Sequence, residues 1–398
     1  MTGDPDPVPP VDVACPSCGW PVGPQDNFCE ACRAELAPAV VSGEDPVPAT
    51  ECPFCQSAQI TPDGYCESCG RKLPSSRDHT EIDLGLLAGV TDRGLRHRRN
   101  EDAMALATAE LPDGPAAVAV VCDGVSSTRR PDEASLAASQ AAVHVLLAAV
   151  RTGHDLTEAS RDAISAAQEA VAGLAKPGEA AALDPPSATF VSAVLTSEAV
   201  TLCWLGDSRG YWLGTGPEAV SQQLTRDDSV AGEMVAAGLL SEADALALPQ
   251  AHVVTGWVGA DLSGAAPHVT RFEPPGPGAL LLCSDGLWNY QPEAAKLAAQ
   301  ALPGALSDPL AASSALVSFA LESGGMDNVT VVLAPFPLRS APAAAPPADP
   351  SADPATDLAE HPADHPVDDP ADRPGSHDET AAPPARLDPE EKPADEPA

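Results

Sequence analysis

Residues 118–124 read Val-Ala-Val-Val-Cys-Asp-Gly, an apolar run that ends in an aspartate and a glycine. A short continuous apolar run that ends at a turn signal is typical of a buried β-strand. A carboxylate at the end of such a strand is held rigidly and can still reach solvent. A simple strand-ending turn explains a single Asp-Gly pair equally well. Whether Asp123-Gly124 indicates a functional site therefore depends on what borders the other apolar runs.

Four further acidic signals border apolar runs elsewhere in the chain. They are Asn100-Glu101-Asp102 before 103–107, Asp207 after Leu205-Gly206, Asp285-Gly286 after Leu282-Cys283-Ser284, and Asp327-Asn328 before Val329-Thr330. Carboxylates that converge in a protein interior are costly unless cations neutralise them. Hard oxygen ligands favour Mg²⁺ or Mn²⁺ over zinc. The sequence therefore predicts a divalent-cation site built from strand ends.

The order of the expected elements indicates the fold class. Strand-like runs occur at 84–90, 103–107, 118–122, 188–196, 200–205, 210–213, 279–283 and 329–333. Apolar residues at three- and four-residue spacing predict helices at 133–151, 156–175, 292–301 and 309–322. Because strands and helices do not alternate regularly, mainly antiparallel sheets with separate helix layers are favoured. We expect an α+β fold, a four-layer α-β-β-α sandwich.

Taken together, the order and contents of these motifs resemble the PPM family, the metal-dependent protein phosphatases of the 2C type. The resemblance covers residues 83–337 and rests on Asn100-Glu101-Asp102, Asp123-Gly124, Ser187-Ala188-Thr189, Gly206-Asp207-Ser208-Arg209, Leu224-Thr225-Arg226-Asp227-Asp228, Ser284-Asp285-Gly286-Leu287-Trp288 and Asp327-Asn328-Val329-Thr330. It implies hydrolysis of phosphoserine and phosphothreonine in proteins, against Ser/Thr kinases. A water activated by two Mg²⁺ or Mn²⁺ ions would attack the phosphorus in line.

The resemblance also implies a role for each matching residue. Asp123 would bridge the two ions, the Gly124 carbonyl would bind one of them, and Asp327 and Asp285 would hold one each. Glu101 and Asp102 would act through bound waters, and Asp207 with Asp285 would form a third, weaker site. Asn328 would lie beside the first site, and the segment from Asp227 to Gly256 would be a mobile flap.

One position departs from the family pattern. The arginine that grips the substrate phosphate usually lies three residues after the glycine of the first motif, where this chain has His97, flanked by Arg96, Arg98 and Arg99. A histidine changes charge near neutral pH and lacks the bidentate fork of a guanidinium. Either His97 takes the role, or Arg99 does from the same face of a strand, or the segment is a solvated basic turn.

Eight of the eleven cysteines lie before residue 70 in two units of equal spacing. The first unit contains Cys15, Cys18, Cys29 and Cys32, and the second contains Cys52, Cys55, Cys66 and Cys69. Two Cys-x-x-Cys turns can surround one ion with four thiolates. We expect two structural Zn²⁺ ions in zinc-ribbon-like units at 13–34 and 50–74, with disulfides or redox chemistry as the alternative. A protein-docking role suits these units better than nucleic-acid binding.

Charge and composition limit the partners. The chain has 58 acidic residues against 21 Lys+Arg, a formal net charge of −37, which repels nucleic acid and anionic membranes. Residues 1–12 and 338–398 are acidic and rich in proline, so we expect disorder there, and a linker at 35–49. Neither a secretory signal nor an apolar run of about 18 residues is visible, which favours the cytoplasm.

Three functions remain in competition at this point. An active phosphatase would have phosphoproteins and components of Ser/Thr kinase pathways as partners. A pseudophosphatase or scaffold would recruit partners through the zinc units. Hydrolysis of a small phosphoester would use the same ions. The presence of Asp123, Asp207, Asp285 and Asp327 favours the active enzyme.

Overall fold

The computed structural model describes residues 51–61, 64–71, 73, 75–175, 184–216, 219–259 and 266–338, and the backbone of three short strands before them. The predictions for residues 1–12, for the first cysteine unit and for 339–398 therefore lie outside the described residues, apart from the paired strands β1 (Val13–Ala14) and β2 (Pro21–Val22).

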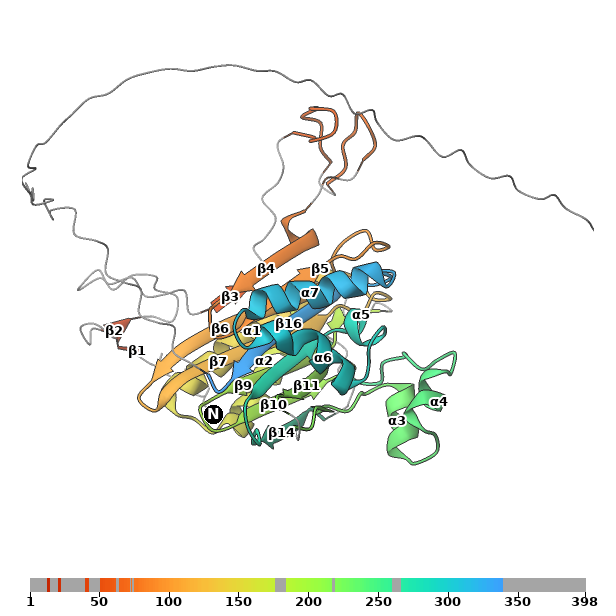
Figure 1. The fold of residues 1–398 in the computed structure, drawn as a ribbon. Coiled ribbons are helices and arrows are strands. Elements are labelled where there is room, and N and C mark those ends of the chain that lie inside the picture. Colours follow the sequence, from red (N-terminus) through yellow and green to blue (C-terminus); the bar gives the residue numbers. More distant parts are fainter. Residues whose placement is uncertain are drawn as a thin grey trace, which may run out of the picture. The chain divides into compact units, whose positions relative to one another are not determined.

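Two six-stranded antiparallel sheets form the centre of the domain (Figure 1). The first sheet has the order β14 (His268–Phe272), β10 (Val200–Leu205), β9 (Phe190–Leu195), β7 (Gly114–Asp123), β6 (Asp102–Leu111) and β3 (Val40–Ser42). The second has the order β12 (Gln222–Gln223), β11 (Arg209–Gly214), β15 (Gly278–Cys283), β16 (Val329–Phe336), β5 (Ala88–Asp92) and β4 (His79–Asp83). A separate pair joins β8 (Ser187–Ala188) to β13 (Val258–Gly259).

The central strands are buried on both faces, which explains their continuous apolar runs. In β7, Ala117, Ala119 and Val121 lie in the core between the two sheets. Val118 and Val120 alternate with them and lie in a second core beneath the helices. Because successive side chains of a strand point to opposite faces, both sets of positions must be apolar. A strand with one solvent-exposed face would instead alternate polar and apolar residues.

Helices cover the outer face of each sheet. The first sheet carries α1 (Pro131–Thr152) and α2 (Leu156–Gly173), and the second carries α6 (Ala294–Ala305) and α7 (Pro309–Glu322). The layer order is helix, sheet, sheet, helix, and the predicted α+β class is confirmed. The ends of these helices follow local chemistry, since Asp155 and Asp308 accept N-cap hydrogen bonds from Glu158 N and Ala311 N.

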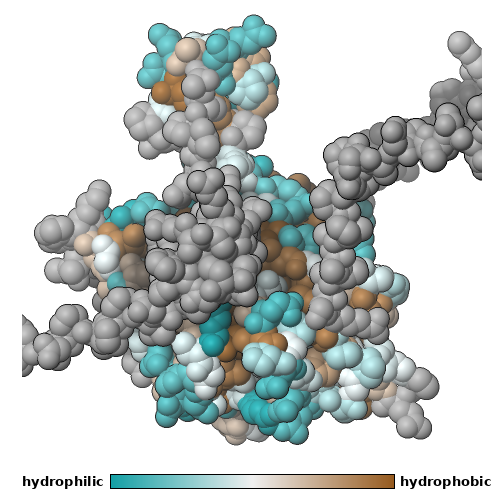
Figure 2. All heavy atoms as spheres, turned by 90° about the vertical axis from the view of Figure 1, so that its left-hand side faces the viewer, coloured by the Kyte–Doolittle hydropathy of each residue, from teal (hydrophilic) through white to brown (hydrophobic). Residues whose placement is uncertain are grey.

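Helix α1 is, among the described residues, the one helix long and apolar enough to cross a membrane by length and composition. Its apolar face is already occupied. Ala138, Ala142 and Leu146 are fully buried and pack in the core shared with β6, β7 and α2. We therefore identify α1 as a core helix. In the space-filling view, hydrophilic and smaller hydrophobic areas are mixed over the visible face of the described residues (Figure 2).

Three predicted boundaries differ from the structure. The run at 84–90 is not one strand, because residues 84–87 form the turn between β4 and β5, where Gly85 has φ +73° and donates to Asp83 Oδ1. A glycine is favoured at such a positive φ. Part of the expected linker, Val40–Ser42, pairs with β6 as an edge strand. Its two valines suit a strand, and the domain also begins earlier than residue 83, with β4 at His79.

The expected flap, Asp227 to Gly256, contains two short helices, α3 (Val230–Ala236) and α4 (Glu242–Leu246), which extend away from the sheets (Figure 1). They share a small core that includes Ala231, Ala245 and Ala251. Another short helix, α5 (Asp285–Trp288), follows β15 directly.

Candidate metal centre

Five aspartates come together where strands of both sheets end. Asp102 begins β6 and Asp123 ends β7, and these two residues are direct partners across the antiparallel pair. Asp285 follows β15 and Asp327 precedes β16 in the other sheet. Asp207 lies in the turn between β10 and β11, which links the two sheets. The strand ends predicted to carry the cation ligands are thus neighbours in space, as the electrostatic coupling of their carboxylates also shows.

Hydrogen bonds across the sandwich fix Asp102. Its Oδ2 accepts from the hydroxyls of Ser284 and Thr330, each at 2.7 Å. Both donors belong to the second sheet or its following turn, whereas Asp102 belongs to the first. Neither Ser284 nor Thr330 was predicted as part of the site, although a polar residue next to an apolar strand core is a visible signal.

Glycines allow the loops of the site to touch. A Cβ on Gly286 would lie 1.9 Å from Asn328 O, and a Cβ on Gly94 would lie 2.1 Å from Asp327 O. At Gly124 it would lie 2.4 Å from Pro131 O. Real Cβ atoms do not approach this closely, so glycine is required at all three positions by backbone contact.

Asn328 aligns the acidic pair at the start of β6. Its Oδ1 accepts from Glu101 N at 2.8 Å. Its Nδ2 donates to Arg93 O at 2.7 Å and to Arg99 O at 3.1 Å. One buried side-chain amide therefore holds both ends of the loop 93–99 and the backbone of Glu101 against the Asp327 loop.

The electrostatics of the cluster are unfavourable without cations. Burial, followed by the charges of Asp102, Asp285, Asp327 and Asp207, raises the pKa of Asp123 well above its ordinary value. Burial and the charges of Asp207, Asp327 and Asp102 do the same to the pKa of Asp285. Asp123 and Asp285 keep a limited opening to solvent at the mouth of the cluster. Each carboxylate therefore resists ionisation because of its burial and the charges of its neighbours.

The two deepest aspartates show the same effect. Burial raises the pKa of Asp102 to about 6, although the hydroxyls of Thr330 and Ser284 act in the opposite direction. Burial and the charge of Asp227 raise the pKa of Asp207 to about 7. Two buried carboxylate oxygens, Asp102 Oδ1 and Asp285 Oδ1, have no hydrogen-bond partner within the described structure. Divalent cations fit this set, since they supply the charge and the partners that the carboxylates lack.

His97 and Arg99 occupy different surroundings. His97 Nε2 lies 3.1 Å from Asp327 Oδ1, at the edge of the cluster. Arg99 Nε lies 2.9 Å from Glu101 Oε1, and its Nη1 lies 3.3 Å from Asp132 Oδ1. The expectation that Arg99 shares the face of a strand was wrong, because the chain forms turns and bends up to Glu101 and β6 begins only at Asp102.

The Glu101 carboxylate is held by neighbouring protein groups. Ser126 Oγ donates to its Oε2 at 2.5 Å, while Arg99 holds its Oε1. Its backbone carbonyl accepts from Ser135 Oγ at 2.6 Å. A carboxylate so well supplied with hydrogen bonds suits the predicted indirect role better than direct ligation.

The flap is tied to the centre by a buried ion pair that the sequence analysis did not foresee. Arg209 binds Asp227 through Nε and Nη2, at 2.7–3.2 Å, with both side chains almost fully buried. The guanidinium lies 3.8 Å from the Trp288 ring centroid. Trp288 Nε1 in turn donates to Asp207 O at 2.9 Å. The start of the flap is thus connected to the predicted third site.

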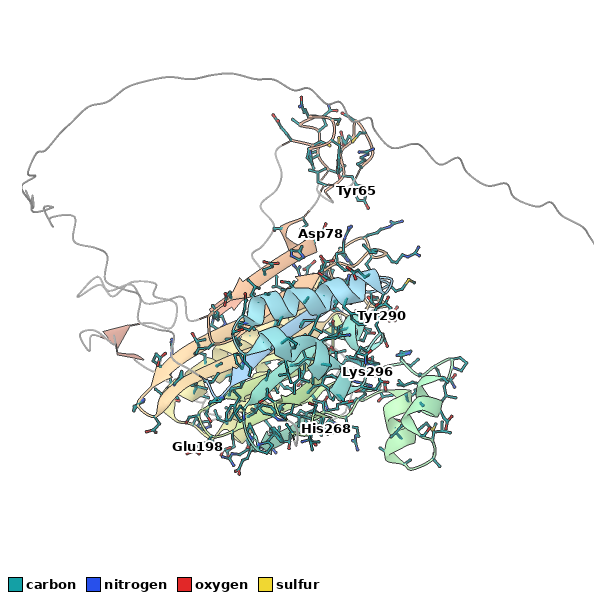
Figure 3. The ribbon with its side chains drawn as sticks, viewed as in Figure 1. Tyr65, Asp78, Glu198, His268, Tyr290 and Lys296 are labelled. Atoms are coloured by element: carbon teal, nitrogen blue, oxygen red, sulfur yellow. The ribbon has the colours of Figure 1, made fainter. Side chains whose placement is uncertain are left out.

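A second contact anchors the next residue of the flap. His268, labelled in Figure 3, lies on β14 with its Nε2 2.8 Å from Asp228 Oδ1. Its ring stacks on Trp204 at 4.9 Å. Asp228 also accepts from Gly206 N, next to Asp207. Both ends of the turn that carries Asp207 therefore contact the base of the flap.

The second cysteine unit brings four thiols together. The sulfur atoms of Cys52, Cys55, Cys66 and Cys69 lie within 4.8 Å of one another, and no other group of three or more potential ligands in the described part of the chain is so compact. The Sγ atoms of Cys55 and Cys66 are 3.4 Å apart. The aspartate oxygens are more widely spread, as suits ions that share ligands and complete their shells with water.

We predict that the aspartate cluster makes the metal-free protein less stable as pH rises. Unfolded aspartates ionise near about pH 3.9, whereas folded Asp102 and Asp207 hold protons to about pH 6 and about pH 7. The folded state therefore binds more protons in this window, and the free energy of unfolding falls as pH rises from about 4 to about 7. Thermal unfolding measured in chelator should therefore give a melting temperature that falls over this pH range.

The variant Asp123→Asn isolates this effect. It should be more stable than the native chain at pH 8 in chelator, with a smaller difference at pH 5, because one repelling carboxylate is gone. Asp162→Asn, on the exposed face of α2, should follow the native curve. Parallel curves for the native chain and Asp123→Asn would contradict the electrostatic account.

Comparison with known proteins places this arrangement in a family. Residues 93–301 match the family model described as Protein phosphatase 2C. The chain is 30% identical over 251 residues to the serine/threonine phosphatase stp of Listeria monocytogenes, covering 61% of this chain and 92% of the relative. Its likeness to the corresponding protein of Listeria innocua is 33% over 147 residues, 36% of this chain and 55% of the relative.

The fold is also shared with a solved structure. The serine/threonine phosphatase Stp1 from Staphylococcus aureus aligns with 65% of this chain and 98% of its own, at 22% sequence identity and a TM-score of 0.52. The matched segment contains the aspartates up to Asp285, and the full alignment to the Listeria monocytogenes relative spans nearly all of that protein. The chain therefore belongs to the protein phosphatase 2C family.

Proposed function

We propose that the five-aspartate centre hydrolyses phosphoserine and phosphothreonine esters of proteins. Family membership makes the chain a metal-dependent serine/threonine phosphatase; the proposal assigns the work to particular residues. The observation that supports it most strongly is the convergence of carboxylates whose pKa values are raised by burial and by one another. Such a set is poised to bind divalent cations, Mg²⁺ or Mn²⁺.

In this proposal Asp123, Asp285, Asp327 and the Gly124 carbonyl would hold two ions, with Asp123 serving both. Asp207, with Asp285, would serve a third, weaker site. When bound, the ions would supply an activated water as nucleophile and neutralise the phosphoryl oxygens. Glu101 and Asp102 would act largely through waters bound to the ions, and Ser284 and Thr330 keep the Asp102 carboxylate in place.

The direct test is phosphate release from a phosphothreonine peptide in the presence of Mn²⁺. The native chain should be active, and Asp123→Ala should reduce turnover at least about a hundredfold, because a ligand shared by both ions is lost. Asp162→Ala, an exposed aspartate of α2, should be unaffected. A folded native chain that releases no phosphate with any divalent cation would instead support the pseudophosphatase, or scaffold, alternative.

We propose His97 as the residue that binds the substrate phosphate. It lies at the edge of the cluster against Asp327, whereas Arg99 is engaged by Glu101 and Asp132. His97→Ala should raise KM for the phosphopeptide by about tenfold, the scale of one charged hydrogen bond, with a smaller change in kcat. His97→Arg should keep a low KM. If His97→Ala leaves KM unchanged and Arg99→Gln raises it, the role belongs to Arg99.

The cysteine units are proposed to hold structural Zn²⁺, one ion each. For the second unit the support is the compact group of four thiols around a minimal core of Cys52, Cys66 and Leu73. So small a core cannot stabilise a fold alone, and zinc would supply the missing free energy. With four thiolates the ion has no open position. The exposed Phe54, with the Arg71 guanidinium 5.0 Å from its ring centroid, suits protein docking.

Zinc content tests this proposal. The full chain should bind two zinc ions, and Cys52→Ser should bind one fewer, because three thiolates leave the second unit open. Cys203→Ala, a buried cysteine beneath α2, should retain both ions. Equal zinc content in native and Cys52→Ser chains would contradict a zinc site there.

We also propose a cytoplasmic location, since zinc sites built from thiolates need cysteines that stay reduced.

A further inference from the structure

The loop 93–99 holds an unusual share of the positive charge of this chain. Arg93, Arg96, Arg98 and Arg99 are four of only 21 Lys+Arg in a protein of net charge −37. One cationic group is enough to bind the phosphate that is hydrolysed. The remaining charge on this loop therefore needs another explanation, and its position beside the aspartate cluster points to the substrate.

The side chains of the loop line a recess next to the metal centre. The residues that line the recess are Tyr65, Arg96, His97, Arg98, Arg99, Glu101 and Ser126. His97 reaches Asp327, and Ser126 follows Asp123-Gly124 closely in the chain and donates to Glu101. A phosphoresidue at the aspartates would thus place its sequence neighbours at this recess.

The loop is held in place on its backbone. Leu95 N donates to Gly325 O at 2.8 Å, and Gly94 adopts φ +72° against the Asp327 carbonyl. Asn328 binds the carbonyls of Arg93 and Arg99. The cationic side chains therefore project from a fixed frame, which lowers the ordering cost of binding.

The four arginines differ in their surroundings. Arg93 lies 4.0 Å from Asp78, and Arg99 lies between Glu101 and Asp132. Arg96 and Arg98 line the recess together with Arg99, and all three are exposed. Exposed charges at the rim of a site act mainly on encounter and on the choice of partner. Arg96 and Arg98 are therefore accessible to an incoming substrate.

We propose that the recess of Arg96 and Arg98 selects phosphoprotein segments that carry a second anionic group beside the phosphoresidue. This inference rests on the proposed phosphatase function and names the substrate class of the same site. The net charge of the chain repels acidic segments at long range, and the local arginines reverse that field at the site itself. The second group is a carboxylate or a further phosphate, because arginine binds both in the same way.

The test uses the full chain and three phosphothreonine peptides of equal length. In the first, the residues beside the phosphothreonine are neutral. In the second they are Asp and Glu, and in the third a neighbouring residue carries a non-hydrolysable phosphonate. The native chain should hydrolyse the two anionic peptides with a kcat/KM about tenfold above the neutral one, mainly through KM. The advantage should shrink as salt is raised. Whichever anion gives the larger gain identifies the preferred group.

The variant Arg96→Glu/Arg98→Glu should lose or invert this preference. The matched control Arg151→Glu/Arg161→Glu changes the same charge at exposed positions of α1 and α2 and should retain it. Fluorescence anisotropy of an acidic peptide that carries a phosphonate in place of phosphothreonine gives a second readout, independent of turnover. This peptide should bind more weakly to Arg96→Glu/Arg98→Glu than to the control variant.

The outcomes distinguish the phosphatase function from substrate selection by the recess. If the native chain hydrolyses none of the peptides, the proposed phosphatase function fails. If it hydrolyses all three with equal kcat/KM, or if the preference survives in Arg96→Glu/Arg98→Glu, the phosphatase function stands and the recess proposal is overturned.

Discussion

The burial and mutual repulsion of a cluster of five aspartates is the constraint on which the rest of this structure depends. Two sheets bring Asp102, Asp123, Asp207, Asp285 and Asp327 close enough that the pKa of each of the four most buried is raised above its usual value. Hydrogen bonds from Thr330 and Ser284 offset the rise in pKa only in part at Asp102. The surrounding contacts hold the carboxylates in place: backbone touches backbone at three glycines, and the Asn328 amide binds the backbone of Arg93, Arg99 and Glu101. Cations are the missing counter-charge.

The sandwich architecture makes that counter-charge a structural element as well as a catalytic one. The first sheet supplies Asp102 and Asp123, and the second supplies Asp285 and Asp327. The hydroxyls of Ser284 and Thr330 already join the sheets through Asp102. Ions bound between the same strands would tighten that junction. The Arg209–Asp227 pair extends the connection to the flap, so cation binding, sheet packing and flap position share one network.

Much of this was predictable from sequence, for a physical reason. The continuous apolar run at 118–124 predicted a strand buried on both faces. Acidic residues at the ends of several such strands predicted that their carboxylates converge on cations. What could not be predicted depends on contacts distant in sequence. The apolar run 84–90 hides a turn at Gly85. Arg99 lies on a bend rather than a strand because Asn328 holds its carbonyl. Helices α3 and α4 are too short for a periodic signal, and β3 pairs only because β6 offers it an open edge.

The central claim is that these carboxylates exchange protons for divalent cations, and calorimetric titration with Mn²⁺ tests it most directly. Measured at pH 6.5 in buffers of different ionisation enthalpy, the heat reports the number of ions bound and the protons released. The account predicts at least two ions per chain and a net release of protons, because carboxylates with raised pKa values must ionise to become ligands. Binding of a single ion, or binding without proton release, would contradict it.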